Sequence, residues 1–569
     1  MPAVILENVR KVFTKPDCTA LESLTASIRE GMITGLVGPD GAGKTTLLRL
    51  IAGLLSPTEG TVTVLGKNPV KAAKDLRDAL GYMPQKFGLY EDLSVQENLE
   101  LYADLRNVIG AERRKTFARL LDFTNLHRFT DRMAGKLSGG MKQKLGLACT
   151  LLGKPKLLLL DEPGVGVDPI SRRELWSMVR NLAGEGMSII WSTAYLDEAE
   201  QCDEVLLLNE GRLLFAGVPS ALTSRVGERC FQVRGFLGRP RAALAKVIKM
   251  PGVMDGSVQG YHVRVLMDNP ARAKAVSSVL GESVSLVPVA PRFEDAFIDC
   301  LGGMKTYESA LAVHMKKREQ DGAVVIEARH LTKMFGTFKA TDDVTFTVKR
   351  GEIFGLLGPN GAGKSTTFKM MCGLLKVSSG DALVMGLDLK HSASAARQKL
   401  GYMAQKFSLY ENLTVWQNME FFSGVYGLGR SEQREAMNAM EAIFHLQSLR
   451  NVEAGTLPLG FKQRLALACA VMHEPDILFL DEPTSGVDPV TRREFWTHIN
   501  GVVEKGITVM VTTHFMDEAE YCDRIGLVSN GKLVAVGTPD ELKQQAMSEQ
   551  NPEPSMEDAF IALVSRKEI

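Results

Sequence analysis

Two apolar runs that lead into glycine-rich turns stand out in the pattern of hydrophobic and polar positions. Residues 32–38 read MITGLVG and residues 352–358 read EIFGLLG. Beyond each turn the chain continues as an apolar stretch, KTTLLRLIAGLL from residue 44 and KSTTFKMMCGLL from residue 364. A short apolar run bounded by glycine indicates a buried strand, and the longer stretch after the turn indicates a helix. The pattern therefore predicts a strand, a glycine-rich turn and a helix at both places.

A second pair of apolar runs ends in adjacent carboxylates. Residues 156–163 read KLLLLDEP and residues 476–483 read DILFLDEP. A parallel strand with both faces covered is apolar throughout, and open α/β sheets bind ligands at the carboxyl ends of such strands. These runs predict a parallel sheet in each half of the chain, with acids at its ligand-binding edge. An acid pair that merely starts a helix is the alternative.

The two halves of the chain are copies of one domain. GPDGAGKTT at Gly38 returns as GPNGAGKST at Gly358, an offset of 320 residues, and the same offset relates LDEPGVGVDP to LDEPTSGVDP. Near the end of each copy the offset falls to 263 residues, between RFEDAFIDCL at Arg292 and SMEDAFIALV at Ser555. The first copy therefore carries 57 additional residues.

The additional residues predict a small α+β appendage. Between Cys230 and Pro291 the pattern indicates a strand, a helix, a strand pair, a helix and a strand. The polar segment that follows is typical of a connector. We expect a first domain over residues 1–226, the appendage over 227–303, a linker over 304–322 and a second domain over 323–569.

Both glycine-rich turns match the pattern G-x-x-x-x-G-K-[ST] between a strand and a helix. Glycine lets backbone N–H groups surround phosphate oxygens, and the helix N-terminus adds positive potential. Lys44 and Lys364 would meet the β- and γ-phosphates of a nucleotide, and the hydroxyls of Thr45 and Ser365 would bind Mg²⁺. The predicted phosphate loops comprise Gly38, Pro39, Asp40, Gly41, Ala42, Gly43, Lys44, Thr45 and Thr46, and Gly358, Pro359, Asn360, Gly361, Ala362, Gly363, Lys364, Ser365 and Thr366.

The acid pairs supply the groups that hydrolysis would need. Asp161 and Asp481 fit an outer-sphere hold on Mg²⁺. Glu162 and Glu482 fit general bases, or positioning groups, for an attacking water. We therefore expect metal binding and catalysis at the ends of these two strands.

Four further side chains are candidates, one glutamine and one phenylalanine in each copy. Gln85 and Gln405 follow short strands at equal distances from the phosphate loops, which favours contact with Mg²⁺ and the attacking water over a plain surface position. Phe13 and Phe335 precede the phosphate loops and would stack on adenine. A core position is the alternative for these two rings.

The two copies differ at one histidine. His514 closes the strand ITVMVTTH, where an imidazole would hydrogen-bond the γ-phosphate and the attacking water. A lone histidine is often structural, but this position, one strand after the acids, favours the catalytic interpretation. The equivalent segment of the first copy reads MSIIWSTAY and has Ala194, which offers no hydrogen bond.

Composition narrows the class of protein. The 67 basic and 67 acidic side chains leave no net charge, which argues against tightly bound RNA or DNA. No run approaches the 18 apolar residues typical of a membrane span, and the N-terminus shows no secretion signal. The eight cysteines lack CxxC clusters and indicate reduced packing residues, as in the cytoplasm.

Taken in order, these motifs resemble the nucleotide-binding domains of ATP-binding cassette proteins. The resemblance rests on the glycine-rich loops, the glutamines, LSGGM at residues 137–141, the acid pairs, the GVDP turns and His514, and it covers nearly the whole chain except the appendage. It implies an α/β fold with two tandem P-loop NTPase (ABC ATPase) domains and a small α+β appendage between them. It also implies ATP and Mg²⁺ as cofactors.

The layout of two cassettes in one chain with EDAFI ends is most similar to the ATPase subunits of bacterial drug-exporter systems. That resemblance implies two separate membrane-spanning partner subunits and a peripheral position on the cytoplasmic face of the inner membrane. The amphipathic segments that follow Gln85 and Gln405 would grip those partners. Core packing is the alternative for their apolar faces.

The family pairs its cassettes head to tail, with each ATP between one copy's phosphate loop and the other copy's LSGGQ-like motif. The second phosphate loop would then face Ser138, Gly139 and Gly140, and that site is complete. The first phosphate loop would face a segment in which Pro458 has no N–H or hydroxyl and Leu459 adds a branched side chain. The first site, which also has Ala194, is therefore expected to bind ATP and hydrolyse it poorly. The altered motif comprises Leu457, Pro458, Leu459 and Gly460.

Two other classes of protein stay open. A soluble tandem-cassette translation or repair factor would need a nucleic-acid surface, and such relatives usually carry a long charged linker, a coiled coil or metal sites. The present chain has an α+β appendage and no net charge instead. A nucleotide-gated binding protein without useful hydrolysis is disfavoured by the complete set of groups around Glu482.

Overall fold

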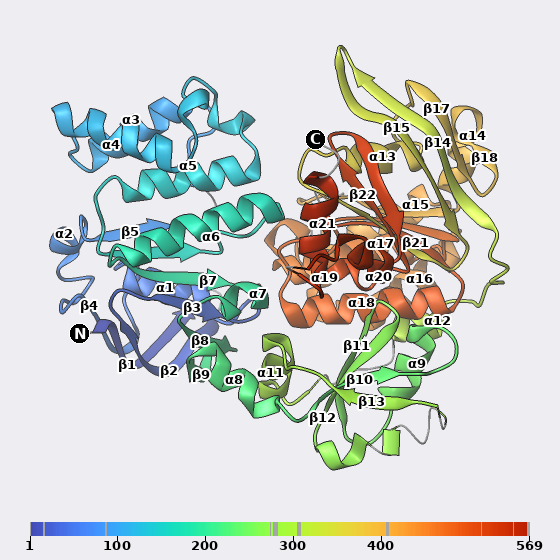
Figure 1. Cartoon of the computed structure of the whole chain (residues 1–569), viewed down its shortest axis with the longest axis horizontal. Helices are drawn as coiled ribbons and strands as arrows, with labels where there is room; N and C mark the ends of the chain where they lie inside the picture. The colour runs from blue at the N-terminus through green and yellow to red at the C-terminus, as the bar shows by residue number, and fades with distance from the viewer. Residues whose placement is uncertain are drawn as a thin grey trace. The chain divides into compact units, whose positions relative to one another are not determined.

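Figure 1 shows the computed structural model of the chain. It falls into two compact units, each containing one copy of the repeated domain. One unit comprises Met1–Val226, Pro291–Cys300 and Gly486–Pro489, and the other comprises Gly227–Ala290, Leu301–Ser485 and Val490–Ile569. The structure describes residues 2–14, 17–85, 88–273, 275–276, 281, 283–303, 309–405, 409–513, 515–549 and 551–565.

A six-stranded sheet with the order β5-β6-β7-β3-β8-β9 organises the first cassette. Its strands are parallel except for β9, which runs antiparallel to β8. Strands β3, β6 and β7 are buried along their whole length, as their continuous apolar runs predict. A smaller antiparallel sheet has the order β2-β1-β4. The strands are β1 (Pro2–Thr14), β2 (Asp17–Arg29), β3 (Ile33–Val37), β4 (Glu59–Val64), β5 (Leu80–Met83), β6 (Leu157–Asp161), β7 (Ser188–Thr193), β8 (Glu204–Asn209) and β9 (Arg212–Gly217).

The helices of the first cassette include a helical subdomain in which α3 and α4 pack against α5. Helix α11, which carries the sequence EDAFI, packs against α7 and α8. Its residues group with the first unit, whereas the sequence analysis placed them in the appendage. The helices are α1 (Lys44–Ile51), α2 (Ala73–Leu76), α3 (Val95–Leu105), α4 (Gly110–Phe123), α5 (Gly139–Leu151), α6 (Pro169–Gly184), α7 (Leu196–Glu200), α8 (Pro219–Thr223) and α11 (Phe293–Cys300).

The second cassette repeats this topology. Its six-stranded sheet has the order β19-β20-β21-β16-β22-β23, and its antiparallel sheet has the order β15-β14-β17-β18. The predicted α/β fold with two copies of one domain is thus confirmed. The strands are β14 (Val324–Phe335), β15 (Phe338–Lys349), β16 (Ile353–Leu357), β17 (Ser379–Val384), β18 (Leu387–Asp388), β19 (Leu400–Met403), β20 (Ile477–Asp481), β21 (Thr508–Thr513), β22 (Arg524–Ser529) and β23 (Lys532–Gly537).

The helices of the second cassette follow the same plan, with α15 and α17 in contact and α21 packed against α19 and α20. No helix among the described residues is long and apolar enough to cross a membrane. The helices are α12 (Ala310–His314), α13 (Lys364–Met371), α14 (Leu389–Arg397), α15 (Val415–Val425), α16 (Arg430–Ile443), α17 (Leu459–Val471), α18 (Pro489–Glu504), α19 (Met516–Ala519), α20 (Pro539–Ala546) and α21 (Met556–Ser565).

The appendage contains a four-stranded antiparallel sheet with the order β11-β12-β10-β13, and helix α9 packs against β11 and β12. Strand, helix, strand pair and last strand occur in the predicted order. The second predicted helix, over residues 271–280, falls largely outside the described residues. The elements are β10 (Cys230–Arg234), α9 (Pro240–Val247), β11 (Val253–Gln259), β12 (His262–Met267) and β13 (Ser285–Pro288).

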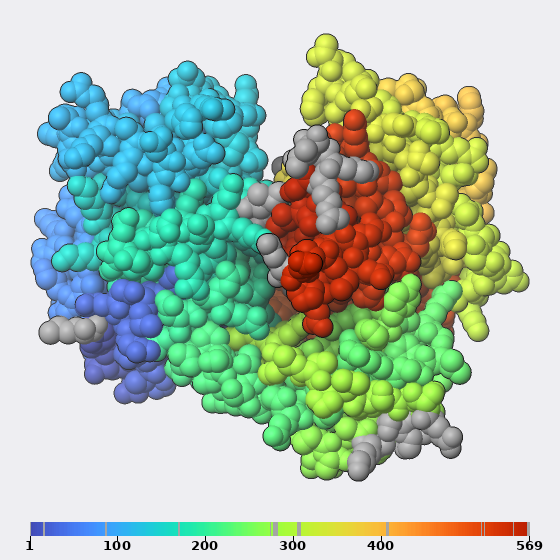
Figure 2. Space-filling model, viewed as in Figure 1, coloured from blue at the N-terminus to red at the C-terminus, as the bar shows by residue number. Residues whose placement is uncertain are grey.

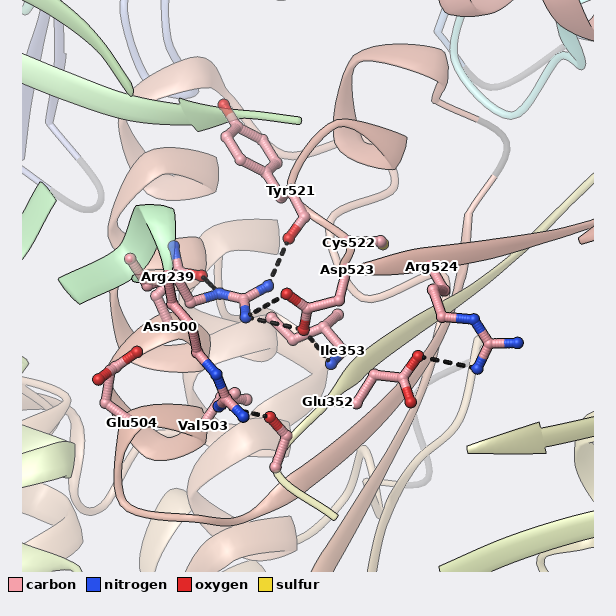
Figure 3. Close-up of polar contacts among 12 residues, drawn as sticks. Arg239, Glu352, Ile353, Asn500, Val503, Glu504, Tyr521, Cys522, Asp523 and Arg524 are labelled. Atoms are coloured by element: carbon pink, nitrogen blue, oxygen red, sulfur yellow. Dashed lines mark hydrogen bonds and ion pairs between the residues drawn. The ribbon is translucent and has the colours of Figure 1, made fainter. Parts of the chain in front are cut away.

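The appendage packs on the second cassette, although it interrupts the chain at the end of the first. The buried guanidinium of Arg241 donates to both carboxylate oxygens of Asp523 at 2.8 Å and to the carbonyl oxygen of Tyr521 at 2.9 Å. Figure 3 shows Asn500, Tyr521 and Asp523 around this contact. Figure 2 shows the appendage, in green, against the red C-terminal part of the second cassette. The appendage and the second cassette therefore form one compact unit.

Candidate functional site

The phosphate loop of each cassette lies between the end of a central strand and the start of a helix. In the first cassette, Gly43 caps α1 with a φ of 99°, and a Cβ built there would lie 2.5 Å from the carbonyl oxygen of Ala20. Only glycine fits this position, so the backbone can close around a ligand at the helix N-terminus. In the second cassette Gly363 has the same φ, and its Cβ would lie 2.4 Å from the carbonyl oxygen of Ala340.

The lysine of each phosphate loop is buried and held by the loop itself. Lys44 Nζ donates to the carbonyl oxygens of Gly38 at 2.7 Å and Pro39 at 3.1 Å, and it lies 3.2 Å from Glu162 Oε1. A fixed cation between the loop and an acid is suited to hold a phosphate. In the second cassette Lys364 makes the matching contacts with Gly358 at 2.6 Å, Pro359 at 3.0 Å and Glu482 Oε1 at 3.8 Å.

The first residue after each lysine meets the first acid of the buried strand. Thr45 Oγ1 donates to Asp161 Oδ1 at 3.1 Å, and Ser365 Oγ donates to Asp481 Oδ1 at 3.3 Å. Burial raises the pKa of both aspartates. A cation at this point would restore the charged form, because a carboxylate and a hydroxyl are oxygen ligands of the kind that Mg²⁺ prefers.

These ligands do not make a complete metal site by themselves. Among the described residues, no cluster of three or more histidine, cysteine, aspartate or glutamate side chains is placed to hold a metal ion. Mg²⁺ usually keeps waters and takes ligands from substrate phosphates. The paired hydroxyl and carboxylate of each cassette therefore suit a cation that arrives with a nucleotide.

The structure brings each predicted glutamine to its predicted glutamate. Gln85 Nε2 donates to Glu162 Oε2 at 2.6 Å, and Gln405 Nε2 donates to Glu482 Oε2 at 2.8 Å. These residues lie 77 positions apart in each copy, so the contact depends on the parallel pairing of β5 with β6 and of β19 with β20. Each glutamate is thereby oriented between a lysine and an amide.

Both glutamates have an unusual backbone conformation. Glu162 has a φ of 52° and Glu482 a φ of 49°, in the left-handed region that non-glycine residues rarely adopt. The amide of Glu482 donates to the carbonyl oxygen and the hydroxyl of Thr512, each at 3.0 Å, which holds this conformation. Strain of this kind concentrates at functional sites.

The two candidate adenine-stacking rings lie at the tips of strands β1 and β14. Phe13 is half-buried, and Phe335 is exposed, with 51% of its surface accessible. Lys11 and Lys333 each place the ammonium nitrogen 5.2 Å from the centre of the adjacent ring. Neither phenylalanine is fully buried in a core, so adenine stacking stays a prediction for both.

The residue that follows β7 or β21 differs between the two cassettes: it is Ala194 in the first and His514 in the second. Ala194 directly follows β7 and is buried. His514 lies outside the described residues. The neighbouring strands pair in register, with Asp161 opposite Ser192 and Asp481 opposite Thr512, so the acid strand and this segment end at the same edge of the sheet.

Sequence reasoning missed a buried glutamate at this edge. Glu518 accepts hydrogen bonds from Thr513 Oγ1 at 2.8 Å and from Thr484 Oγ1. It therefore links the residue before His514 to the loop that begins with Glu482. The sequence DEAE recurs in both copies and marks this glutamate, but it does not indicate which residues the glutamate contacts.

The first cassette lacks half of this link. Glu198, the equivalent of Glu518, accepts from Thr193 Oγ1 at 2.6 Å and from Trp191 Nε1 at 2.8 Å. Gly164 stands where the second cassette has Thr484, and a Cβ there would lie 2.1 Å from Glu198 Oε1. Burial raises the pKa of Glu198 to about 7. The loop after Glu162 thus has no side-chain tie of this kind to the segment after β7.

The LSGGM segment and its counterpart start their helices differently. Ser138 caps α5, and its hydroxyl accepts from the backbone N–H of Met141 at 3.3 Å. A Cβ on Gly139 would lie 2.6 Å from the carbonyl oxygen of Gly166, so glycine is required there. Helix α17 begins after Pro458, which provides no side-chain cap, and its first residue is Leu459.

Comparison with known proteins finds similarity to ATP-binding proteins of ABC transporters. A family model described as ABC transporter matches residues 21–165 and 341–485. A protein of Escherichia coli (strain K12) named probable multidrug ABC transporter ATP-binding protein YbhF is 62% identical over 99% of this chain and 97% of its own length. The linearmycin resistance ATP-binding protein LnrL of Bacillus subtilis is 36% identical over 38% of this chain and 70% of its own length. A solved structure of an ATP-binding subunit of an ABC transporter is 29% identical, covers 42% of this chain and 99% of its own, and has a TM-score of 0.39.

Proposed function

The chain belongs to the ABC transporter family, and from this premise we propose that it is the ATP-hydrolysing subunit that energises a membrane exporter of drug-like or lipophilic compounds. Its two repeated domains are ABC-type ATPase domains. The observation that carries the proposal is the lysine, glutamine and glutamate set at the phosphate loop of each cassette. The substrate class is supported by the relative named probable multidrug ABC transporter ATP-binding protein, which is 62% identical along almost the whole chain.

We assign turnover to the site built on the second phosphate loop. Lys364 would bind the β- and γ-phosphates of ATP, and Ser365 with Asp481 would hold Mg²⁺, which supplies charge neutralisation on those phosphates. Glu482 would accept the proton of the attacking water, and Gln405 would orient both the water and this carboxylate. His514 would hydrogen-bond the γ-phosphate. Ser138, Gly139 and Gly140 of the other copy would complete the site in a head-to-tail pair of cassettes.

The first phosphate loop forms the weaker site in this proposal. Its lysine, Thr45 and acids would still bind ATP and Mg²⁺. Pro458 lacks the N–H and hydroxyl that a signature serine offers to a γ-phosphate, and Leu459 occupies the place of a glycine. Ala194 offers no hydrogen bond, and Gly164 removes a tie beside Glu162. Four departures at one nucleotide support binding with slow hydrolysis.

Membership of the transporter family supports membrane partners for this chain. We propose two separate membrane-spanning subunits, which the helical subdomains of the cassettes would grip, and a peripheral position on the cytoplasmic face of the bacterial inner membrane. Closure of the cassettes on ATP would then be coupled to transport. No nucleic acid is required.

The test is to purify the tagged chain from detergent-solubilised membranes and to measure its ATPase rate with and without the copurifying proteins. We expect two multi-span proteins and a higher rate in the complex. Ribosomes in place of membrane proteins would favour the soluble tandem-cassette class and overturn the proposal. No ATP hydrolysis in either preparation would instead favour a nucleotide-gated binding protein.

A further inference from the structure

One acid anchors the start of a central strand in each cassette. Asp203 Oδ2 accepts a hydrogen bond from the backbone N–H of Ile33 at 2.8 Å. Asp523 Oδ2 accepts the equivalent bond from the backbone N–H of Ile353, also at 2.8 Å. Ile33 begins β3 and Ile353 begins β16, the strands that lead to the two phosphate loops. Asp523 is therefore the structural counterpart of Asp203, and Figure 3 shows it beside Ile353.

The first cassette pairs this acid with an arginine of its own. Arg180 of α6 places Nη1 3.6 Å from Asp203 Oδ1 and donates through Nη2 to the carbonyl oxygen of Gln201. The side chain of Arg180 is 49% exposed, so it reaches the acid along the surface of its own cassette. The guanidinium beside Asp203 thus comes from the same domain as the acid.

The second cassette has Asn500 at the position of Arg180, and its guanidinium comes from the appendage. Arg241 of α9 donates to both carboxylate oxygens of Asp523 and to the carbonyl oxygen of Tyr521, which is equivalent in sequence to the carbonyl that Arg180 binds. Its Nε donates to Asn500 Oδ1 at 2.8 Å, and only 4% of its side chain is exposed. The appendage therefore supplies the group that α18 lacks.

The exchange at position 500 distinguishes the two cassettes, whereas a second ion pair of the same interface does not. Asp255 of β11 pairs with Arg493 of α18 at 2.9 Å, and the first cassette has Arg173 at the equivalent position. An appendage placed on the first cassette would bring Arg241 against Arg180, so two guanidinium groups would compete for one carboxylate. Repulsion of this kind selects a partner as effectively as attraction does.

The appendage is joined to the first cassette at both of its ends. It comprises Gly227–Ala290, and the residues on either side, up to Val226 and from Pro291, belong to the first unit. Helix α11, which follows the appendage, packs against α7 and α8 of the first cassette. The appendage thus belongs to the first copy in sequence and to the second unit in its contacts. Its docking adds a second link between the cassettes to the connector.

We propose that Asn500 leaves an arginine-binding site open on the second cassette and that Arg241 fills it, so that the appendage clamps the two cassettes together. The contact with Asp523 gives geometric specificity, because a guanidinium presents a rigid fork of donors to a carboxylate. The clamp needs no nucleotide and does not depend on the transport function proposed above. It holds the cassettes at high effective concentration when no nucleotide is bound.

Two backbone amides report docking in the full-length chain. The N–H of Gly260 donates to the carbonyl oxygen of Glu520 at 3.2 Å, and the N–H of Tyr261 donates to Asp540 Oδ2 at 2.9 Å. Both bonds cross from the appendage to the second cassette, so their hydrogen exchange follows opening of the interface. Strand β10 lies between β12 and β13 within the appendage sheet, so its exchange reports folding of the appendage. Mass spectrometry resolves the two regions.

Variants at position 500 test the open site. Asn500→Arg gives the second cassette the arginine of the first, and it should speed exchange at Gly260 and Tyr261 about 10² or more, because a buried charge next to Arg241 would be unpaired. Asn500→Ala loses one hydrogen bond and keeps the site open, so it should speed exchange less than about tenfold. Exchange in β10 should stay unchanged in both variants. Unchanged protection in Asn500→Arg, or loss of protection in β10 as well, would overturn the assignment.

Cutting the connector tests the clamp. A protease site inserted after Gly302, an exposed glycine between α11 and α12, lets the folded full-length chain be cut there. Without nucleotide, the two fragments should elute together on size-exclusion chromatography. Fragments with Asn500→Arg should separate, whereas Arg180→Asn, the reverse exchange in the first cassette, should leave them together. Separation of the unmodified fragments, or joint elution of those with Asn500→Arg, would contradict the proposal.

Discussion

The two cassettes hold the same lysine, hydroxyl and acid pair at matching positions, but they differ in the groups that would surround the far end of a nucleotide. Glu482 has Thr484 and Glu518 beside it, whereas Glu162 has Gly164 in the place of Thr484. The helix that begins within LSGGM is capped by Ser138, whereas the other copy has Pro458 at the equivalent position. Duplication has thus kept the groups that would bind phosphates and altered those that would act on the γ-phosphate.

Among the positions that differ between the two cassettes, the signature segments are expected to give the largest effect when they are exchanged. Ser138→Pro with Gly139→Leu should lower the ATPase rate of the assembled complex by about 10² or more, because removal of such a preorganised donor costs about that factor. Pro458→Ser with Leu459→Gly, made in the other copy, should leave the rate unchanged or raise it. Steady-state phosphate release measures both.

The clash predicted at Gly139 requires a control for folding. Its Cβ would meet the carbonyl oxygen of Gly166 at 2.6 Å, so the double variant could lose stability as well as activity. Ser138→Pro alone avoids that clash and should still lower the rate, while the thermal unfolding midpoint falls by only a few degrees, the cost of one lost helix cap. Equal losses from the two double variants would break the comparison.

A smaller effect is expected from the link through Glu518. Thr484→Gly copies the first cassette and should reduce kcat about tenfold, because a buried hydrogen bond is lost next to Glu482. Thr484→Ser keeps the hydroxyl and should stay close to the unmodified rate. If the glycine variant keeps full activity, Glu518 serves the fold alone and does not position the loop of Glu482.

The smallest effect is expected from the pH dependence of nucleotide binding. The two phosphate loops differ at one titrating residue. Burial raises the pKa of Asp40 to about 6, with Glu162 adding to the rise and Lys44 opposing it, whereas the second loop has Asn360. As the pH rises through about 6, Asp40 becomes charged and repels a triphosphate. Nucleotide affinity at the first site should therefore fall a few-fold between about pH 5.5 and 7.5.

Site-restricted variants separate this effect from the titration of ATP itself. The chain with Lys364→Ala reports the first site, and the chain with Lys44→Ala reports the second, so the difference between their binding curves isolates Asp40. Adding Asp40→Asn to the first of these should remove the difference. A pH dependence that is the same at both sites would contradict the role of Asp40. Equilibrium binding of a fluorescent ATP analogue measures all three.

The fold and most of the site could be predicted because the chain repeats itself. The offset of 320 residues fixed the phosphate loops, the acids and the glutamines before any geometry was known, and the structure places Gln85 Nε2 at 2.6 Å from Glu162 Oε2. The pattern of apolar and polar positions likewise predicted the strands of the appendage and its first helix, in their order along the chain. Local pattern and spacing were sufficient for these features.

Other features depend on contacts that local pattern does not specify. Arg241 pairs with Asp523, which lies 282 residues further along the sequence. The sequence around these two residues does not predict that the appendage packs on the second cassette. Glu518 is buried and accepts hydrogen bonds from two threonines, and neither feature can be read from the acidic letters around it. The contacts of α11 are of the same kind. This helix packs against α7 and α8 and groups with the first cassette, although the predicted appendage extended to residue 303.

The central claim is that one of the two nucleotides is turned over at Glu482 and the other is held at Glu162. Its most direct test compares the ATPase rates of the Glu482→Gln and Glu162→Gln variants, each assembled with the membrane partners. Glu482→Gln should lower the rate by about 10² to 10⁴, the range for loss of a general base, while Glu162→Gln should retain a large share of it. Loss of activity from Glu162→Gln with activity retained in Glu482→Gln would contradict the account.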